Sequence, residues 1–129
     1  MDAIPFDRDK HMEAIHEWMQ ARGQRLTEGG EAYFPATGRI VEDVLVGFLY
    51  RTDAPAVGYM DSFVGNPAKP RRDIRRAMYL VVEALQVAAK EQGVSLLCGA
   101  TRVPSILEAC IANGWHMKQC LATYVTKEL

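Results

Sequence analysis

Hydrophobic residues recur with two periods along this chain, and each period predicts one kind of element. The first apolar stretch, residues 3–6, has the length of a short strand. Helical spacing follows, and we expect a helix that Asp9 caps and Gly23 ends. The apolar positions of this helix are Met12, Ile15 and Met19. Residues 24–38 contain glycine and proline at several positions, which indicates at most a helical turn followed by a loop.

A period of two replaces the helical spacing after residue 38. Three runs of β-branched and aromatic residues, RIVE, VLVGFLYRT and AVGYMDSFV, are separated by Asp43 and by the turn sequence DAPA. Such side chains favour extended backbone, and such short separations favour hairpins. We therefore expect three antiparallel strands joined by tight turns.

The strongest helical pattern comes next and ends at Gly93. One apolar face, typical of a helix packed on a sheet, is formed by Ile74, Ala77, Met78, Val81, Leu85 and Ala88. Residues 94–101 are an apolar run of strand length, and residues 104–114 predict a short helix. The start of this helix has the spacing of a capping box, formed by Ser105 and Glu108. Residues 116–129 alternate well enough for one or two final strands.

The elements follow one another as β-α-β-β-β-α-β-α-β, with room for a short second helix before the first hairpin. Strands that meander early and then alternate with helices predict a mixed sheet. The predicted fold class is α/β (α+β), with a mostly antiparallel central sheet and helices on both faces. A chain of 129 residues, 49% of them hydrophobic, is long enough for one core and short for two. We expect a single domain spanning residues 1–129.

The net charge and the cysteine content argue against several classes of protein, among them nucleic-acid-binding and metal-binding proteins. The formal net charge is -1, from 15 basic and 16 acidic residues, which argues against a nucleic-acid partner or an acidic lipid surface. No segment approaches the ~18 apolar residues of a membrane span, and the start lacks the pattern of a signal peptide. The three cysteines stand at wide spacings without histidines at metal-ligand intervals, so no metal site is expected. We expect a cytoplasmic protein with reduced thiols.

The segment NPAKPRRDIRRAM, residues 66–78, concentrates positive charge before the long helix. Five basic side chains occupy the eight positions from Lys69 to Arg76. Cations at a helix N-terminus oppose the macrodipole, so helix stability does not explain them. Two interpretations stay open. The cluster can capture a phosphate-bearing ligand, or it can be a solvated helix start whose arginines pair with carboxylates or with a partner surface.

Three motifs flank the long helix. FVGNP ends the preceding strand, residues 72–77 read Arg-Asp-Ile-Arg-Arg-Ala, and residues 110–115 read Cys-Ile-Ala-Asn-Gly-Trp. In this order they resemble the GNAT superfamily of N-acetyltransferases, which has a V-x-P-like step, an R-x-x-G-x-G/A loop and a Tyr-x-x-x-Gly-Phe pattern at these places. The likeness covers nearly the whole chain. It implies the GNAT fold, acetyl-CoA as cofactor and a small-molecule or protein amine as acceptor.

The resemblance also implies which residues hold acetyl-CoA. Strand backbone at Phe63 and Val64 is expected to bind pantetheine. Backbone N–H groups at the start of a helix carry partial positive charge and bind pyrophosphate. The residues expected at this helix start are Arg72, Asp73, Ile74, Arg75, Arg76 and Ala77.

Asp61 is the candidate general base that takes a proton from the amine. An acidic residue inside an apolar strand must face solvent, a cleft or a partner. The period of two puts Tyr59 on the same side of the strand as Asp61, and Met60 and Ser62 on the other side. Glu42 on the preceding hairpin is a second candidate base. Neither carboxylate has a spacing that is specific to this chemistry.

Cys110 stands where the resemblance implies a tyrosine that protonates the departing thiolate. Two further departures from the family pattern are Arg75, in the place of the middle glycine, and Asp73, which can cap the helix donors itself. All three favour a second hypothesis, a catalytically degenerate GNAT-fold structural or interaction protein. Its arginine-rich edge would contact an acidic protein surface or a second copy of the chain. Small proteins of tailed bacteriophages look similar, so this hypothesis includes a phage virion component.

Overall fold

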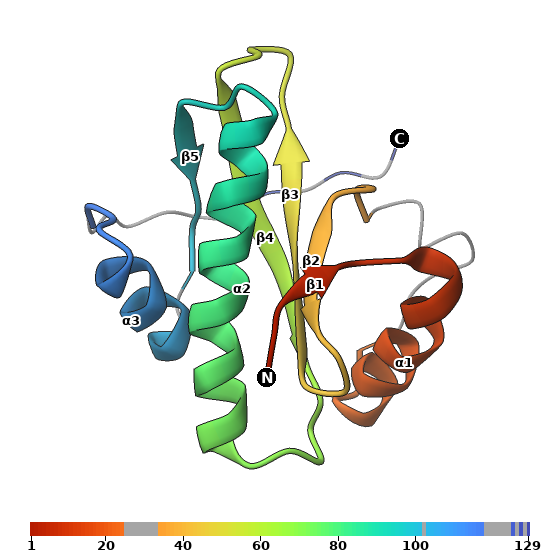
Figure 1. Cartoon of the computed structure of the whole chain (residues 1–129). Coiled ribbons are helices and arrows are strands. Elements are labelled where there is room, and N and C mark those ends of the chain that lie inside the picture. Colours follow the sequence, from red (N-terminus) through yellow and green to blue (C-terminus); the bar gives the residue numbers. More distant parts are fainter. Residues whose placement is uncertain (25–33, 102, 118–124, 126, 128) are drawn as a thin grey trace.

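The computed structural model describes residues 1–24, 34–101 and 103–117, together with residues 125, 127 and 129. Within them the chain forms a five-stranded sheet and three helices (Figure 1). The elements are, in order, β1 (Ile4–Pro5), α1 (Arg8–Ala21), β2 (Gly38–Val41), β3 (Leu45–Arg51), β4 (Val57–Gly65), α2 (Arg71–Glu91), β5 (Leu96–Cys98) and α3 (Pro104–Ala112). The second helix and the final strands expected from the sequence fall largely on residues 25–33 and 118–124, which lie outside the described residues.

The strands lie side by side in the order of the sequence, β1-β2-β3-β4-β5. The first four are antiparallel neighbours, and β5 pairs with β4 in parallel. A parallel pair needs a crossover connection, and α2 supplies it by running back along the sheet from the end of β4 (Figure 1). The predicted hairpins and the mixed, mostly antiparallel sheet are therefore confirmed.

Helices cover both faces of the sheet, as predicted. Alternation along β3 sends Leu45 and Leu49 toward α2 and α3, and it sends Val46 and Phe48 toward α1. Both faces are buried, which explains why β3 is apolar at nearly every position rather than at every second one. The core on the α1 side is built from Phe6, Ile15, Trp18, Phe34, Ile40, Val46, Phe48 and Val64.

Two predicted helix caps are wrong. The side chain of Asp7, not Asp9, caps α1, by accepting a hydrogen bond of 3.0 Å from the backbone N–H of Asp9. In α3 no side chain caps the start, because Pro104 occupies the first helical position and Ser105 already lies inside the first turn. The predicted stop of α1 is confirmed, since Gly23 follows the helix with a φ of 72°.

The predicted strand at residues 94–101 is shorter than expected, because only Leu96–Cys98 pair with the sheet. The long helix agrees with its prediction, and its face of small and aliphatic residues is buried against the sheet. No helix among the described residues has the length and apolar character needed to cross a membrane.

Candidate functional site

The parallel strands β4 and β5 separate part-way along the sheet. They pair from Val57, Gly58 and Tyr59 to Leu96, Leu97 and Cys98. Beyond Tyr59, β4 continues to Gly65 with β3 as its only partner among the described residues, while the chain after β5 turns away into α3. We call this divergence the fork. The end of β4 beyond the fork leads directly into the loop that starts α2 (Figure 1).

A β-bulge distorts β4 at the fork. Val64 pairs with Val46 and Asp61 pairs with Phe48, so Ser62 and Phe63 together oppose the single residue Gly47. Ser62 has a φ of 58°, the left-handed conformation that such an irregularity needs. An extra residue of this kind resets the alternation of side chains along the strand.

The bulge corrects the predicted orientation of Ser62. Its hydroxyl lies 2.6 Å from the hydroxyl of Tyr50, whose ring packs on the α1 side of the sheet. Ser62 therefore shares the face of Asp61 and not that of Met60. The other orientations are confirmed, since Tyr59 is the cross-strand partner of Tyr50 and Met60 is buried on the α2 side.

Asp61 is exposed on this face, and its Oδ1 accepts a hydrogen bond of 2.7 Å from the backbone N–H of Ser62. Its charge reaches the neighbouring phenol. Burial is the main cause that raises the pKa of Tyr50; the hydrogen bond with Ser62 opposes it, and the nearby Asp61 carboxylate adds a smaller increase. The Tyr50 phenol consequently keeps its proton at neutral pH.

After the bulge, the side chains of Phe63 and Val64 lie on opposite faces of the sheet. Val64 is buried on the α1 side, and Phe63 packs on the α2 side above Gly47. A Cβ atom at Gly47 would lie 2.6 Å from Cε1 of Phe63, far inside contact distance. The bulge and its phenylalanine can be packed in this way only because residue 47 has no side chain.

No described side chain caps the start of α2, so its first N–H groups are available to a ligand. Its N-cap is Pro70, which makes no capping hydrogen bond, and no described side chain caps the first turn. Asp73 had been expected to cap these donors, but its carboxylate instead lies 3.9 Å from Nε of Arg72. Anions bind at such uncapped helix starts because the N–H groups there have no partner within the helix.

The five cations before and within this turn divide into two groups. Arg75 forms an ion pair of 2.9 Å with Glu108 of α3, and Lys69 forms one of 3.0 Å with Asp43 of the β2–β3 turn. Arg72 has a looser contact of 3.9 Å with Asp73, and its side chain is 88% exposed. Arg71 and Arg76 are exposed, and they form no ion pair with a described residue. Part of the cluster therefore pairs with the chain's own carboxylates, and part stays available to a ligand.

The remaining residues of the predicted phosphate segment face the core. The Ala77 side chain is fully buried, and Ile74 is half-buried against the same cluster. Their side chains are therefore not placed to contact a ligand, and the backbone N–H of Ile74 already donates to the carbonyl of Pro70 at 3.2 Å. Their role in the architecture is to hold the first turns of α2 against β4.

Cys110 lies in α3 and belongs to the core between α2 and α3. Burial raises the pKa of its thiol. The group is therefore protonated at neutral pH. This state excludes a thiolate nucleophile and leaves a weak proton donor.

Two polar residues that position the site were not identified from the sequence. Asn66 is buried after β4, where its amide nitrogen donates to the Asp43 carbonyl at 2.8 Å and its amide oxygen accepts from the N–H of Ala68 at 2.9 Å. Arg22 at the end of α1 donates from Nε to the carbonyl of Gly65 at 3.2 Å. The Asn-Pro dipeptide at residue 66 was the one local signal for this turn.

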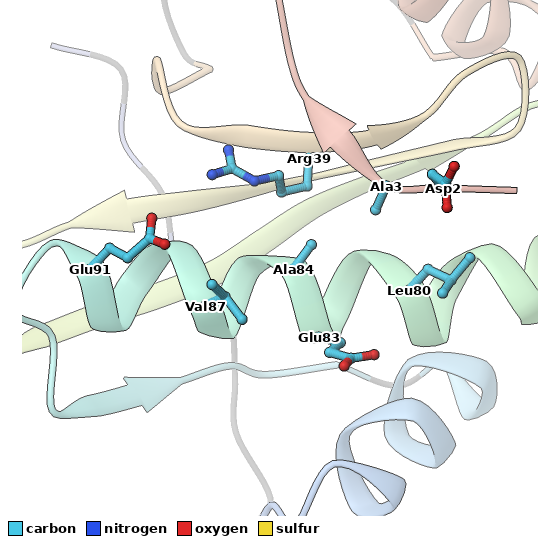
Figure 2. A pocket seen from close by; sticks show the side chains of 8 residues that line it. All are labelled: Asp2, Ala3, Arg39, Leu80, Glu83, Ala84, Val87 and Glu91. Carbon is cyan, nitrogen blue, oxygen red and sulfur yellow. The ribbon is translucent and has the colours of Figure 1, made fainter.

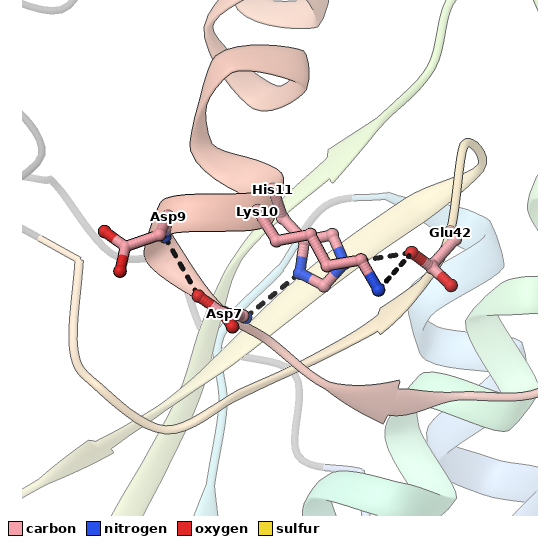
Figure 3. A network of polar contacts seen from close by, with 5 residues as sticks. All are labelled: Asp7, Asp9, Lys10, His11 and Glu42. Atoms are coloured by element: carbon pink, nitrogen blue, oxygen red, sulfur yellow. Dashed lines mark hydrogen bonds and ion pairs between the residues drawn. The ribbon is translucent and has the colours of Figure 1, made fainter.

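Glu42, the second candidate base, is part of a separate network (Figure 3). Its Oε2 lies 3.1 Å from Nε2 of His11 and 3.7 Å from Nζ of Lys10. The hydrogen bond from His11, and then the charge of Lys10, lower the pKa of Glu42. A carboxylate with a lowered pKa is a weaker base, so this network makes Glu42 less suited to accept a proton than an unperturbed glutamate.

A groove of about 360 Å³ lies between α2 and the first strands, on the side of α2 that faces away from the fork (Figure 2). It is lined by Asp2, Ala3, Arg39, Leu80, Glu83, Ala84, Val87 and Glu91. The fork lies on the β5 side of α2 (Figure 1), whereas this groove is lined by Asp2, Ala3 and Arg39 from the β1 side (Figure 2). The two are therefore separate features.

No protein-family model and no curated protein matches the chain. Solved structures do match it over nearly their full length. TTHA1254 from Thermus thermophilus superposes with a TM-score of 0.72 over 99% of both chains, at 16% identity. An aminoglycoside N-acetyltransferase, AAC(6')-Iy in complex with CoA, gives a TM-score of 0.66 at 12% identity, covering 98% of this chain and 99% of the other.

Glucosamine-6-phosphate N-acetyltransferase from Arabidopsis thaliana gives a TM-score of 0.61 at 11% identity, covering 97% of this chain and 98% of the other. The chain has the GNAT fold. This confirms the predicted fold class and the GNAT fold that the resemblance implied. At such identities the likeness establishes the GNAT fold and not the reaction, because one fold carries many functions.

Proposed function

We propose that this GNAT-fold protein is an acetyl-CoA-dependent N-acetyltransferase that acts on an amine. One observation carries the proposal. The uncapped start of α2 stands at the end of the same strand, β4, that leaves β5 at the fork. An extended cofactor with a diphosphate at one end and a thioester at the other fits this combination of a helix start and a free strand edge.

The residues present fit such a cofactor. Backbone N–H groups in the first turn of α2, with the guanidinium groups of Arg71, Arg72 and Arg76 around them, suit a pyrophosphate. Arg75 replaces the family's glycine, but its ion pair with Glu108 directs it toward α3. Backbone of Phe63 and Val64 beyond the fork would bind pantetheine, and the bound thioester would supply the acetyl group.

Asp61 takes the role of general base in this proposal. Its exposed carboxylate beside the fork accepts a proton from the acceptor ammonium, directly or through a water molecule. The free amine could then take up the acetyl group that a bound thioester would supply, with coenzyme A as the leaving group. Cys110 stands in the position of the family's tyrosine, and its protonated thiol would return a proton to the departing thiolate.

The alternative of a degenerate structural protein is not favoured by the solved structures, several of which are named as acetyltransferases. Of the three departures from the family pattern that suggested this alternative, two do not block the start of α2 in the folded chain. Asp73 does not cap α2, and Arg75 is paired with Glu108. A phage origin stays a hypothesis that no feature of the described residues addresses.

Calorimetric titration with acetyl-CoA tests the cofactor directly. We expect micromolar binding, and about tenfold weaker binding for Arg76→Ala, because a charge-assisted contact to phosphate is lost. Arg51→Ala is the matched control, since Arg51 bonds to Gln92 at the opposite end of the sheet and should leave the affinity unchanged. The absence of heat up to millimolar acetyl-CoA would contradict the proposal.

Turnover of the Asp61→Asn variant tests the base. We expect the rate to fall by about 100-fold or more with an acceptor amine, while acetyl-CoA affinity stays the same. An asparagine keeps the hydrogen bond to the Ser62 N–H but cannot take a proton. An unchanged rate would remove Asp61 from the mechanism.

A further inference from the structure

Aromatic rings and a carboxylate lie together on the α1-side face of β3 and β4. Tyr50 and Tyr59 are cross-strand partners, and the next pair on this face is Phe48 with Asp61. Cross-strand partners on one face lie ~5 Å apart at Cβ, and residues two apart along a strand share that face. Tyr59 is 48% exposed and Asp61 is exposed, so both can be reached from solvent.

The bulge adds hydroxyl groups to the same place. Because Ser62 is turned to this face, its hydroxyl and that of Tyr50 lie 2.6 Å apart, next to the carboxylate of Asp61. No described position of β3 or β4 on this face carries a positive charge; these positions are Val46, Phe48, Tyr50, Val57, Tyr59, Asp61, Ser62 and Val64. Asp61 makes no ion pair with a described residue. This surface therefore carries a local negative charge at Asp61, with the aromatic rings of Tyr50 and Tyr59 beside it.

This combination has a definite ligand chemistry. An ammonium group is attracted both by a carboxylate and by the face of an aromatic ring, and the two effects add when ring and carboxylate are neighbours. A carboxylate on the ligand would meet Asp61 at close range and be repelled. The hydroxyl pair accepts and donates hydrogen bonds without changing this sign.

We propose that this surface selects, as acceptor, a primary amine that carries no carboxylate, with an aromatic or other flat apolar group beside the ammonium. The inference rests on the proposed acetyl transfer and names the substrate class of that same site. Amino acids are the class that it excludes. Asp61 thus has two tasks, to attract the charged amine and later to remove its proton.

Tyramine and tyrosine form a matched pair of probes, because they differ only in the carboxylate. We expect tyramine to bind at least about fivefold more tightly than tyrosine in calorimetric titrations, from the repulsion of one exposed charge. Asp61→Asn should abolish this preference by weakening tyramine and not tyrosine. Tyr59→Leu should weaken tyramine by about threefold through loss of the ring face.

Glu83→Gln is the control, because Glu83 is an exposed carboxylate on α2, on the other side of the sheet. It should keep the full preference. Equal binding of the two probes, a preference that survives in Asp61→Asn, or no binding of either probe up to about 10 mM would overturn the inference.

Each titration is run with and without coenzyme A. If tyramine is preferred but coenzyme A does not bind, the proposed acetyl transfer fails and the amine site stands. If coenzyme A binds and the preference is missing, the acceptor class is wrong and the acetyl transfer survives.

Discussion

The hydrogen bonds of His11 show how a single residue connects the elements of this protein. Nδ1 of this buried ring accepts the backbone N–H of Asp7 at 3.0 Å. The proton of the neutral ring must then be on Nε2, which donates it to Glu42. One histidine therefore ties the start of α1 to the turn after β2 (Figure 3).

Replacing Glu42 by glutamine tests this link through its pH dependence. The pKa of Glu42 is lowered from its ordinary value of 4.5 in the folded protein. A lowered pKa means that the charged form stabilises the fold above pH 4.5, and that this stability is lost as the pH falls through the folded pKa. We expect the urea midpoint of wild type to exceed that of Glu42→Gln at neutral pH, and the difference to disappear as the pH falls through the lowered pKa of Glu42.

The control for that experiment is Glu13→Gln, because Glu13 is exposed on the same helix and forms no ion pair with a described residue. Its difference from wild type should stay small at every pH. A pH-independent difference between wild type and Glu42→Gln would show that the charge of Glu42 is not what stabilises the fold.

Strand β4 is the element on which the site depends. Its bulge turns Ser62 beside Asp61, and its last residues lead into α2. Gly47 on the neighbouring strand makes the bulge possible, because the ring of Phe63 occupies the space that a side chain would fill.

Gly47→Ala tests this packing. The new Cβ would meet Phe63 at 2.6 Å and the fully buried Val81 at 3.0 Å, so a rigid ring or the core must shift. We expect a loss of about 1–3 kcal/mol in the free energy of unfolding, measured by chemical denaturation. Gly99→Ala is the control, since its Cβ would meet nothing closer than 3.4 Å and should cost less than about 0.5 kcal/mol. Equal effects of the two changes would contradict the packing argument.

At the scale of the whole molecule, one sheet separates two hydrophobic clusters. Leu85 of α2 belongs to one cluster and Ile15 of α1 to the other, and both are fully buried. Because every strand of the sheet except the short edges contributes to both clusters, we expect the two to unfold together. The prediction of a single domain over residues 1–129 depends on this cooperativity.

Leu85→Ala and Ile15→Ala test it. Each should lower the free energy of unfolding by about 2–5 kcal/mol and shift the same single transition in urea. Val87→Ala, at a position that is 55% exposed on α2, should have little effect. Two separate transitions, each sensitive to only one of the core substitutions, would show that the chain does not unfold as one unit.

The elements could be predicted from the sequence because each depends on nearby residues. The apolar face of α2 repeats with the helical period, and Gly23 and Gly114 mark helix ends through positive φ angles. The predicted caps of α1 and α3 are wrong for two different local reasons. In α1 the neighbouring Asp7 takes the cap position from Asp9, and in α3 Pro104 begins the helix one residue before Ser105, so Ser105 is inside the first turn.

The candidate site was predicted less completely, because its geometry depends on contacts between distant residues. Asp61 and Tyr59 were placed on one face correctly by the period of two. Ser62 was not, since the bulge exists only because Gly47 on another strand leaves room for Phe63. Likewise, Arg75 was predicted to help hold the pyrophosphate, but its guanidinium forms an ion pair with Glu108 on α3.

By itself, the sequence determined the order, type and approximate bounds of the strands and helices, and with them the GNAT fold. Hydrophobic periodicity and turn chemistry act over a few residues, so they are readable without coordinates. Only the tertiary structure decided where β4 leaves β5, which arginines remain unpaired with the chain's own described carboxylates, and which hydroxyls join Asp61. Those outcomes depend on packing between strands and helices that are far apart in the chain, and the local pattern of residues does not predict such packing.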